Sequence, residues 1–257
     1  MEAIKKLNDV SAYQRGMFTS AQARRLGVER YTLARLEKGG SVERVARGVY
    51  RMGGAPSVRE EDVYAAWLSL VPDFEPGVPR ALELTPVAMG ATSAWLQELG
   101  EVGPEPLEFC CGARKQTQRE GITVHKRLLD AADVVYVAGM PATSPARTVL
   151  DLVDGGEDLS LVAAVLEDAL ARGLVADVEG LAEGIDRREG RAPARSQPAR
   201  APRERTLRDA LRERRPVRPG RQEVDKGVRQ GAGCRLQGDA PRPLLVPNLQ
   251  RGRPEVP

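Results

Sequence analysis

Apolar positions in the first 55 residues recur at the spacing of short amphipathic helices, each bounded by helix start and stop signals. Thr19 to Gln22 matches a capping box, in which a hydroxyl and a Gln three residues later satisfy free amides at a helix start. Gly27 permits the positive φ of a tight turn. The pattern predicts helices at residues 3–15, 20–26 and 29–38, the last two forming a helix-turn-helix.

The helix predicted at residues 29–38 separates its apolar side chains from its cations. At about 100° per residue, Leu33 and Leu36 fall on one side. The other side is polar, with Tyr31, Arg35 and Lys38 on it and Arg30 on its flank. A recognition helix in a DNA major groove has this division, because Arg can donate two hydrogen bonds to guanine while other cations neutralise phosphates. The alternative is that these charges only form the solvated face of an amphipathic helix.

The segment that follows, residues 42–51, predicts two short strands around a turn. Arg44, Arg47 and Arg51 project from this hairpin. Three helices followed by a hairpin with Arg at its tip is the order of elements in winged-helix DNA-binding domains, so the hairpin is interpreted as the wing.

Residues 56–185 predict a mixture of helices and strands. Ser57 to Glu60 is a second capping box, expected to open a helix with Trp67 in the core. Thr85 and Pro86 suit the N-cap and first position of another helix. Strands are expected at residues 106–110, 121–127 and 133–138, and a later amphipathic helix at 159–172.

Three polar features of this region have mainly structural interpretations. The basic loop 114–119 is expected at a hairpin tip, either solvated or as a second nucleic-acid contact. His125 is expected to be an ordinary strand residue, because no nucleophile lies near it in the sequence. Ser144 is expected to cap a helix in which Arg147 and Asp151 pair at i, i+4, and it lacks the glycines of a nucleophile elbow.

Apolar periodicity disappears after Ile185, where Arg, Pro, Ala and Gly dominate. Low hydrophobicity with high charge predicts disorder for residues 186–257. Such a basic tail could bind nucleic acid through counterion release. The sequence slightly favours another interpretation, that a GC-rich gene is read out of frame here and the C-terminus is degenerate.

The charges of the chain are segregated, although Lys and Arg exceed Asp and Glu by only 39 to 36. Residues 1–55 have a net charge of +6, residues 56–185 of −13, and residues 186–257 of +10. A cationic module beside an acidic region favours nucleic-acid binding by the first 55 residues.

Cysteine and histidine are too few for most metal chemistry. The chain has the adjacent pair Cys110 and Cys111, the isolated Cys234, and a single histidine. Zinc sites need about four clustered ligands, so we expect no metal and no other cofactor. The sequence has no apolar run of membrane-spanning length and no signal-peptide pattern at its start, so we expect a cytoplasmic protein with no membrane partner.

The first 55 residues resemble the N-terminal winged-helix domain of AbiEi-type antitoxins from type IV toxin-antitoxin systems. The resembling stretches are residues 16–23, 26–28, 33–36 and 42–51, of which Glu43 to Arg51 is the most specific. The resemblance implies binding to inverted repeats in the operon's own promoter, and a nucleotidyltransferase-like toxin as the cognate partner, with direct contact left open. This chain has Glu29 where the family usually has a Ser or Thr cap, which places a carboxylate near the DNA phosphates.

The resemblance continues to about residue 185. The segments Gly139 to Thr148 and Asp168 to Leu174 are similar to the C-terminal region of AbiEi-like proteins. Relatives commonly have histidines in the stretch 88–100, and this chain has none there. Any function of those histidines would be lost here.

The sequence therefore predicts an α+β protein in three parts: a winged helix-turn-helix at 1–55, a mixed α/β domain at 56–185, and the disordered or frameshifted tail at 186–257. We expect a DNA-binding transcriptional repressor that acts as a type IV antitoxin and is not an enzyme. The expected contacts to double-stranded DNA are Arg30, Tyr31, Thr32, Arg35 and Lys38 in the groove, and Arg44 and Arg47 at the wing.

Two alternatives remain from other classes. The chain could be related to nucleases, because proteins with a similar Ser-Pro-Ala-Arg-Thr segment can have a restriction-endonuclease-like end. That end would need an acidic metal-binding cluster near a Lys in β-strands, which residues 186–257 do not predict. The chain could instead be a protein-interaction module that uses its acidic region.

Overall fold

The computed structural model describes residues 2–115 and 117–189, all within one compact unit. The prediction of a disordered or frameshifted tail lies outside the described residues from 190 onward. Residues 186–189 were predicted to belong to that tail, but they continue α8 (Val178–Glu189), whose Ile185 and Leu181 are buried. The described residues mix helices with two sheets, which confirms the α+β class.

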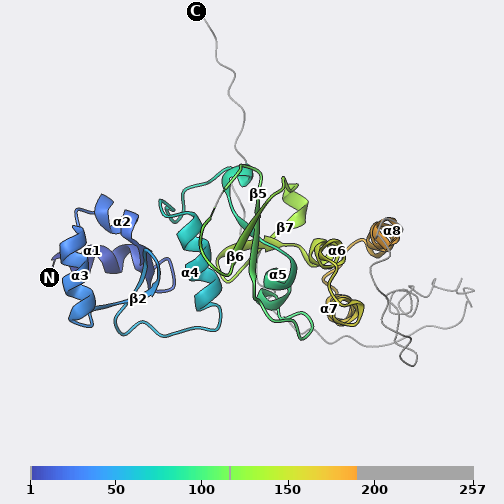
Figure 1. Cartoon of the computed structure of the whole chain (residues 1–257), viewed down its shortest axis with the longest axis horizontal. Helices are drawn as coiled ribbons and strands as arrows, with labels where there is room; N and C mark the ends of the chain where they lie inside the picture. The colour runs from blue at the N-terminus through green and yellow to red at the C-terminus, as the bar shows by residue number, and fades with distance from the viewer. Residues whose placement is uncertain (1, 116, 190–257) are drawn as a thin grey trace, which may run out of the picture. The chain divides into compact units, whose positions relative to one another are not determined.

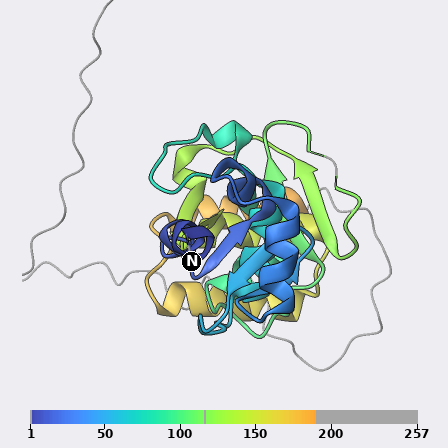
Figure 2. The same cartoon turned by 90° about the vertical axis from the view of Figure 1, so that its left-hand side faces the viewer.

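The N-terminal elements follow the predicted order of a winged helix (Figures 1 and 2). They are α1 (Glu2–Ser11), β1 (Met17–Thr19), α2 (Ser20–Arg25), α3 (Arg30–Lys38), β2 (Val42–Ala46) and β3 (Val49–Met52). The three strands form an antiparallel sheet in the order β1-β3-β2. Helix α1 ends at Ser11 and not near residue 15, because the Gly16 amide bonds to the Ser11 carbonyl in a turn.

A capping box fixes the start of α2, as the sequence predicted. The Gln22 amide donates to Thr19 Oγ1 at 3.1 Å, and the Thr19 amide donates to Gln22 Oε1 at 2.7 Å. The apolar sides of the three helices meet the sheet in one small core, formed by Leu7, Phe18, Ala23, Val28, Leu33, Val42 and Met52. Helix α3 is therefore held on the sheet by Leu33, which leaves its opposite side free.

The middle of helix α4 (Glu61–Leu70) is buried on all sides. Every side chain from Val63 to Leu68 is buried, including Trp67. This core also contains Met17 and Val49 of the first sheet and, from the second, Phe109, Met140 and Ala142. The helix begins three residues later than the capping box at Ser57 predicted, since Ser57 Oγ donates to the Glu61 carboxylate instead of accepting from a backbone amide.

The second sheet has five strands in the order β6-β5-β4-β8-β7. The strands are β4 (Val87–Ala88), β5 (Leu107–Cys111), β6 (Ile122–Lys126), β7 (Val134–Val137) and β8 (Met140–Thr143), with short 3-10 turns η1 (Leu82–Leu84) and η2 (Ala131–Asp133) before β4 and β7. Strand β4 pairs with β5 on one side and β8 on the other.

The predicted helix start at Thr85 and Pro86 is wrong. Strand β4 follows Pro86 directly, and helix α5 (Gly90–Leu96) begins only after it. The Trp67 indole donates to the Pro86 carbonyl at 2.8 Å, and strands on both sides hold the next residues extended. Tertiary pairing overrides the local helix signal here.

The segment between β5 and β6 is also not the predicted hairpin. The two strands are parallel, with Leu107 opposite Ile122 and Cys111 opposite Lys126. Residues 112–121 must therefore return the chain to the same end of the sheet, and we call them the crossover segment.

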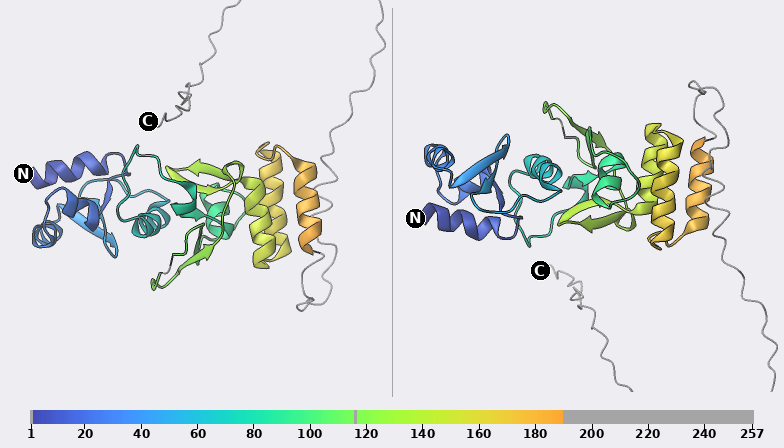
Figure 3. Two further views of the ribbon diagram at one scale, coloured as in Figure 1. Left: turned by 90° about the horizontal axis from the view of Figure 1, so that it is seen from above. Right: turned by 90° about the horizontal axis from the view of Figure 1, so that it is seen from below.

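Four helices complete the C-terminal part: α5, α6 (Pro145–Gly155), α7 (Leu159–Ala171) and α8. Figure 3 shows α6, α7 and α8 side by side. Ser144 accepts a hydrogen bond from the Arg147 amide and Pro145 is the first helical residue of α6, as predicted. Buried hydroxyls join α5 to α6, since Ser93 Oγ and Thr148 Oγ1 are 3.0 Å apart.

One carboxylate inside α6 neutralises two arginines. The Asp151 side chain is fully buried and accepts from Arg147 Nε at 2.9 Å and from Arg127 at the end of β6. Burial raises the pKa of Asp151, and the charges of Arg147 and Arg127 oppose that rise. The interaction ties β6 to α6, so it stabilises the edge of the sheet where the crossover segment returns.

Substituting Asp151→Ala should destabilise the protein by about 3–5 kcal/mol, because it removes the buried anion that two partly buried guanidinium groups share and leaves Arg127 without a carboxylate; Arg147 keeps only Asp133, at 3.5 Å. Urea denaturation of the full chain followed by circular dichroism measures this loss. Glu183→Ala is the matched control: its pair with Arg187 is exposed and should contribute about 0.5 kcal/mol or less. A loss below about 1 kcal/mol for Asp151→Ala would show that this interaction stabilises little.

Candidate nucleic-acid interface

Helix α3 exposes the side chains that the sequence places in a DNA groove. Tyr31 is 79% exposed, and Arg35 and Lys38 follow it on the same side at i+4 and i+7. Thr32 is half-buried on the flank. Leu33 is 3% exposed and faces the core. The separation of apolar and cationic sides expected for α3 is therefore present.

A hollow of about 440 Å³ lies between the start of α3, helix α2 and the wing. It brings together four arginines from three elements: Arg24, Arg30, Arg44 and Arg47. Three of them were predicted as DNA contacts, whereas Tyr31, Arg35 and Lys38 lie along α3 outside the hollow lining. The predicted DNA contacts thus form two neighbouring groups on the winged helix, one lining the hollow and the other along the exposed side of α3.

Arg24 was missed by sequence reasoning. It lies in the last turn of α2, a helix analysed only for its capping box, and it is exposed. The sequence feature that could have indicated Arg24 is the pair of adjacent arginines, Arg24 and Arg25, at the end of α2. These two residues differ in the structure, because Arg25 has Glu75 at 3.9 Å and Arg24 lines the hollow.

The wing is fixed to α2 by its backbone. The Ser20 amide at the start of α2 donates to the carbonyl of Gly48 in the wing turn at 2.9 Å. Gly48 has a φ of +81°, which an L side chain rarely adopts. This turn sets Arg47 at the edge of the hollow.

Arg51 does not project from the wing as predicted. Its guanidinium bonds to Glu43 at 2.6 Å and to Glu61 at 2.7 Å, and only 14% of the side chain is exposed. The cause is α4, whose first residue presents the Glu61 carboxylate to β3. Arg51 therefore connects the wing to α4 and is not available to DNA.

The cations of the interface lack carboxylate partners. Within residues 2–115 and 117–189, no carboxylate oxygen lies within 4.0 Å of the charged nitrogens of Arg24, Arg30, Arg35, Lys38, Arg44 or Arg47. By contrast, many arginines in the described residues after 55 pair with carboxylates, including Arg59, Arg80, Arg127, Arg147, Arg187 and Arg188. Cations without a carboxylate partner thus lie on α2, α3 and the wing, where a polyanion would neutralise them.

One carboxylate also lines the hollow. Glu29 is the N-cap residue of α3, is exposed, and makes no side-chain hydrogen bond to the helix amides. Its charge suits the positive end of the helix dipole. It would also repel a phosphate bound between Arg30 and Arg47.

In the second sheet, His125 lies beside a carboxylate and Cys110 is buried. His125 Nε2 lies 3.3 Å from Glu108 Oε1 on the exposed edge strand β6. Cys110 is buried, which raises the pKa of its thiol to about 12, so it stays protonated. Across the described residues, no three His, Cys, Asp or Glu side chains gather as a possible metal site.

Every described helix is too short or too polar to pass through a lipid bilayer.

Two family models match this chain. Residues 5–53 match the family model described as "Transcriptional regulator, AbiEi antitoxin". Residues 86–199 match "AbiEi antitoxin C-terminal domain". A crystal structure of the RV2827C protein from Mycobacterium tuberculosis is similar at 15% identity and a TM-score of 0.44, over 74% of this chain and 72% of that one. None of the curated proteins matches the chain. Since both models describe AbiEi antitoxins and together match more than half of its residues, the chain belongs to the AbiEi antitoxin family of transcriptional regulators.

Proposed function

We propose that this chain is a sequence-specific DNA-binding repressor that acts in the cytoplasm as the antitoxin of a type IV toxin-antitoxin system. The observation that supports this best is the set of unpaired cations on α2, α3 and the wing of a winged helix. The match of residues 5–53 to a family of transcriptional regulators adds to it.

In this proposal α3 lies in the major groove of the promoter. Arg35 and Lys38, with Tyr31 and Thr32, face the base edges, because these side chains lie on or beside the side of α3 away from the core. Arg30 lies at the start of the helix, where it can reach the base edges or the backbone. These residues provide the sequence discrimination.

The hollow beside α3 receives the DNA backbone. Arg44 and Arg47 of the wing, with Arg24 of α2, are unpaired and can neutralise phosphates. Phosphate contacts fix the position of the protein on the duplex without selecting the sequence. The wing and α2 therefore orient α3.

Repression follows when the protein covers inverted repeats in its own promoter. The toxin implied by a type IV system is a nucleotidyltransferase-like protein, and the proposal does not require the two proteins to touch. It assigns no catalytic step, metal or cofactor to this chain.

Arg35→Ala should reduce discrimination between the promoter sequence and a sequence with altered half-sites by about 1–3 kcal/mol, if Arg35 contacts a base. Gel-shift titrations of both duplexes at one salt concentration measure this ratio. Arg187→Ala, an exposed arginine of α8, is the control and should leave the ratio unchanged. Equal promoter affinity and specificity for Arg35→Ala and wild type would exclude a base contact by Arg35.

Glu29→Gln should strengthen binding to promoter and unrelated duplexes by a similar factor, corresponding to about 0.2–1 kcal/mol. The substitution removes repulsion between a carboxylate and phosphates, and it keeps the size of the side chain. Fluorescence anisotropy at low salt measures both affinities. Glu29→Asp keeps the charge and should bind as wild type does; an affinity for Glu29→Gln no higher than that of Glu29→Asp would show that no phosphate lies near this position.

A further inference from the structure

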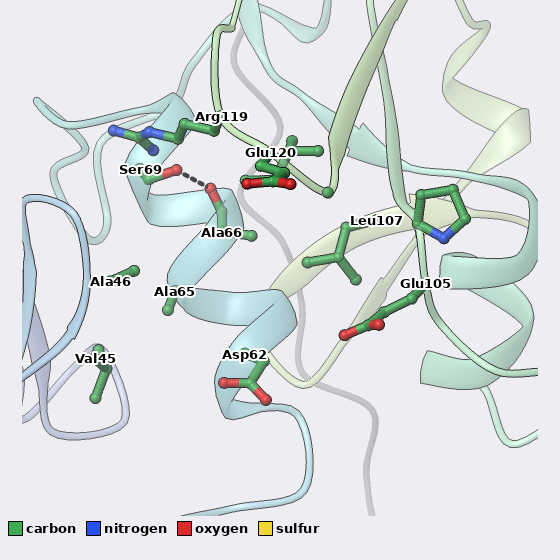
Figure 4. Close-up of a pocket in the computed structure, with 13 residues that line it drawn as sticks. Val45, Ala46, Asp62, Ala65, Ala66, Ser69, Glu105, Leu107, Arg119 and Glu120 are labelled. Atoms are coloured by element: carbon green, nitrogen blue, oxygen red, sulfur yellow. Dashed lines mark hydrogen bonds between the residues drawn. The ribbon is translucent and has the colours of Figure 1, made fainter.

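The crossover segment brings part of the second sheet to the wing. Arg119 Nη2 donates to the carbonyl oxygen of Arg47 in the wing turn at 3.3 Å, across 72 residues of sequence. Figure 4 shows Arg119 beside Ser69 at one end of a cavity between α4, the wing and the crossover segment. The cavity has Asp62 and Glu105 toward its other end.

A second hollow, of about 550 Å³, lies on the Arg119 side of this cavity. Three of its lining residues are cations: Arg47, Lys115 and Arg119. The others, Ser69, Leu70, Thr117 and Gln118, are uncharged, so no carboxylate among the described residues lines it. A hollow lined by cations and uncharged residues is suited to bind an anion.

Two cations of this hollow have N–H groups that make no hydrogen bond within the described residues. Arg119 Nη1 is buried and has no hydrogen-bond partner among the described residues. Lys115 Nζ donates to the Leu70 carbonyl at the end of α4, at 2.6 Å, which uses one of its three protons. Burial lowers the pKa of Arg119, and repulsion from the nearby charge of Arg47 lowers it further. A bound anion would satisfy the unused donors and reduce this repulsion.

We propose that Arg47, Lys115 and Arg119 together bind a backbone phosphate of the promoter duplex, so that the DNA interface continues from the wing onto the crossover segment. This inference rests on the proposed function. Its geometric support is the contact between Arg119 and the wing, and the position of Arg47, which lines both this hollow and the hollow beside α3.

The shared Arg47 favours duplex DNA over a free phosphate ion as the source of the anion. Two cationic hollows that meet at one residue suit a polyanion whose phosphates recur along a strand, whereas a single small ion would occupy only one of them. The carboxylates Asp62, Glu105 and Glu120 line the cavity on the other side of Arg119 and mark where this surface ends.

The test compares salt dependence of DNA affinity in the full chain. For Arg119→Gln and Lys115→Gln, the plot of log affinity against log salt should become less steep by up to about 0.9 in each variant, because the cations share one phosphate and its loss removes at most one phosphate contact. Promoter and unrelated duplexes should weaken by the same factor, because the contact is to the backbone. Arg119→Lys keeps the charge and should retain the wild-type slope, which separates phosphate binding from the hydrogen bond to the wing. Arg187→Gln is the control for a lost surface charge and should leave the slope unchanged.

The outcomes separate the two proposals. If wild type binds the promoter with a salt-dependent affinity and both Gln variants have its slope, the crossover contact is wrong and the proposed function stands. If wild type has no salt-dependent affinity for DNA, the proposed function fails and this inference fails with it.

Calorimetric titration with inorganic phosphate is a second experiment. If phosphate binds and Arg119→Gln abolishes this binding while the DNA slope is unchanged, the hollow binds a free anion and the inference is overturned. Urea denaturation of each variant confirms that it is folded before binding is measured.

Discussion

The packing of α4 against two sheets at once is the constraint on which the arrangement of this protein depends. Six consecutive side chains of the helix, from Val63 to Leu68, are buried, so none of its sides is left to solvent over that stretch. One core contains Met17 from the first sheet and Phe109 from the second. The Arg51–Glu61 ion pair reinforces this packing at the helix start. The wing and the crossover segment approach each other because both are fixed to the same helix.

Local signals in the sequence were sufficient for most of the winged helix. The capping box at Thr19 and the wing arginines at 44 and 47 could be identified because their cause is local: a side chain that caps its own helix, or a turn between neighbouring strands. The exposed side of α3 followed from helical periodicity, with Leu33 as its buried counterpart. Whether these exposed residues bind DNA stays a prediction that the fold itself does not test.

The remaining features depend on contacts between distant residues. Pro86 is a good first residue for a helix, yet pairing with strands that arrive later in the chain keeps the residues after it extended. A basic loop between two strands suggests a hairpin, but nothing local distinguishes it from a parallel crossover. Arg51 follows the free wing arginines along the same hairpin, but it is neutralised by Glu43 across the strand pair and by Glu61 of α4. Arg24 becomes part of the candidate interface because the wing folds over α2.

The shared core around α4 also has a consequence for the order in which the protein is made. Val49 lies sixty residues before Phe109, its partner in that core, and ribosomes add about 5–20 residues per second, so about 3–12 s separate the two. During that interval α4 can pack on Met17 and Val49 but still lacks the second sheet that completes their shared core. A chain cut after residue 55 would lack α4 as well and would expose Met17 and Val49 for its whole lifetime. The part of the molecule that is proposed to read DNA is therefore made first but is completed only when the rest of the fold has been synthesised.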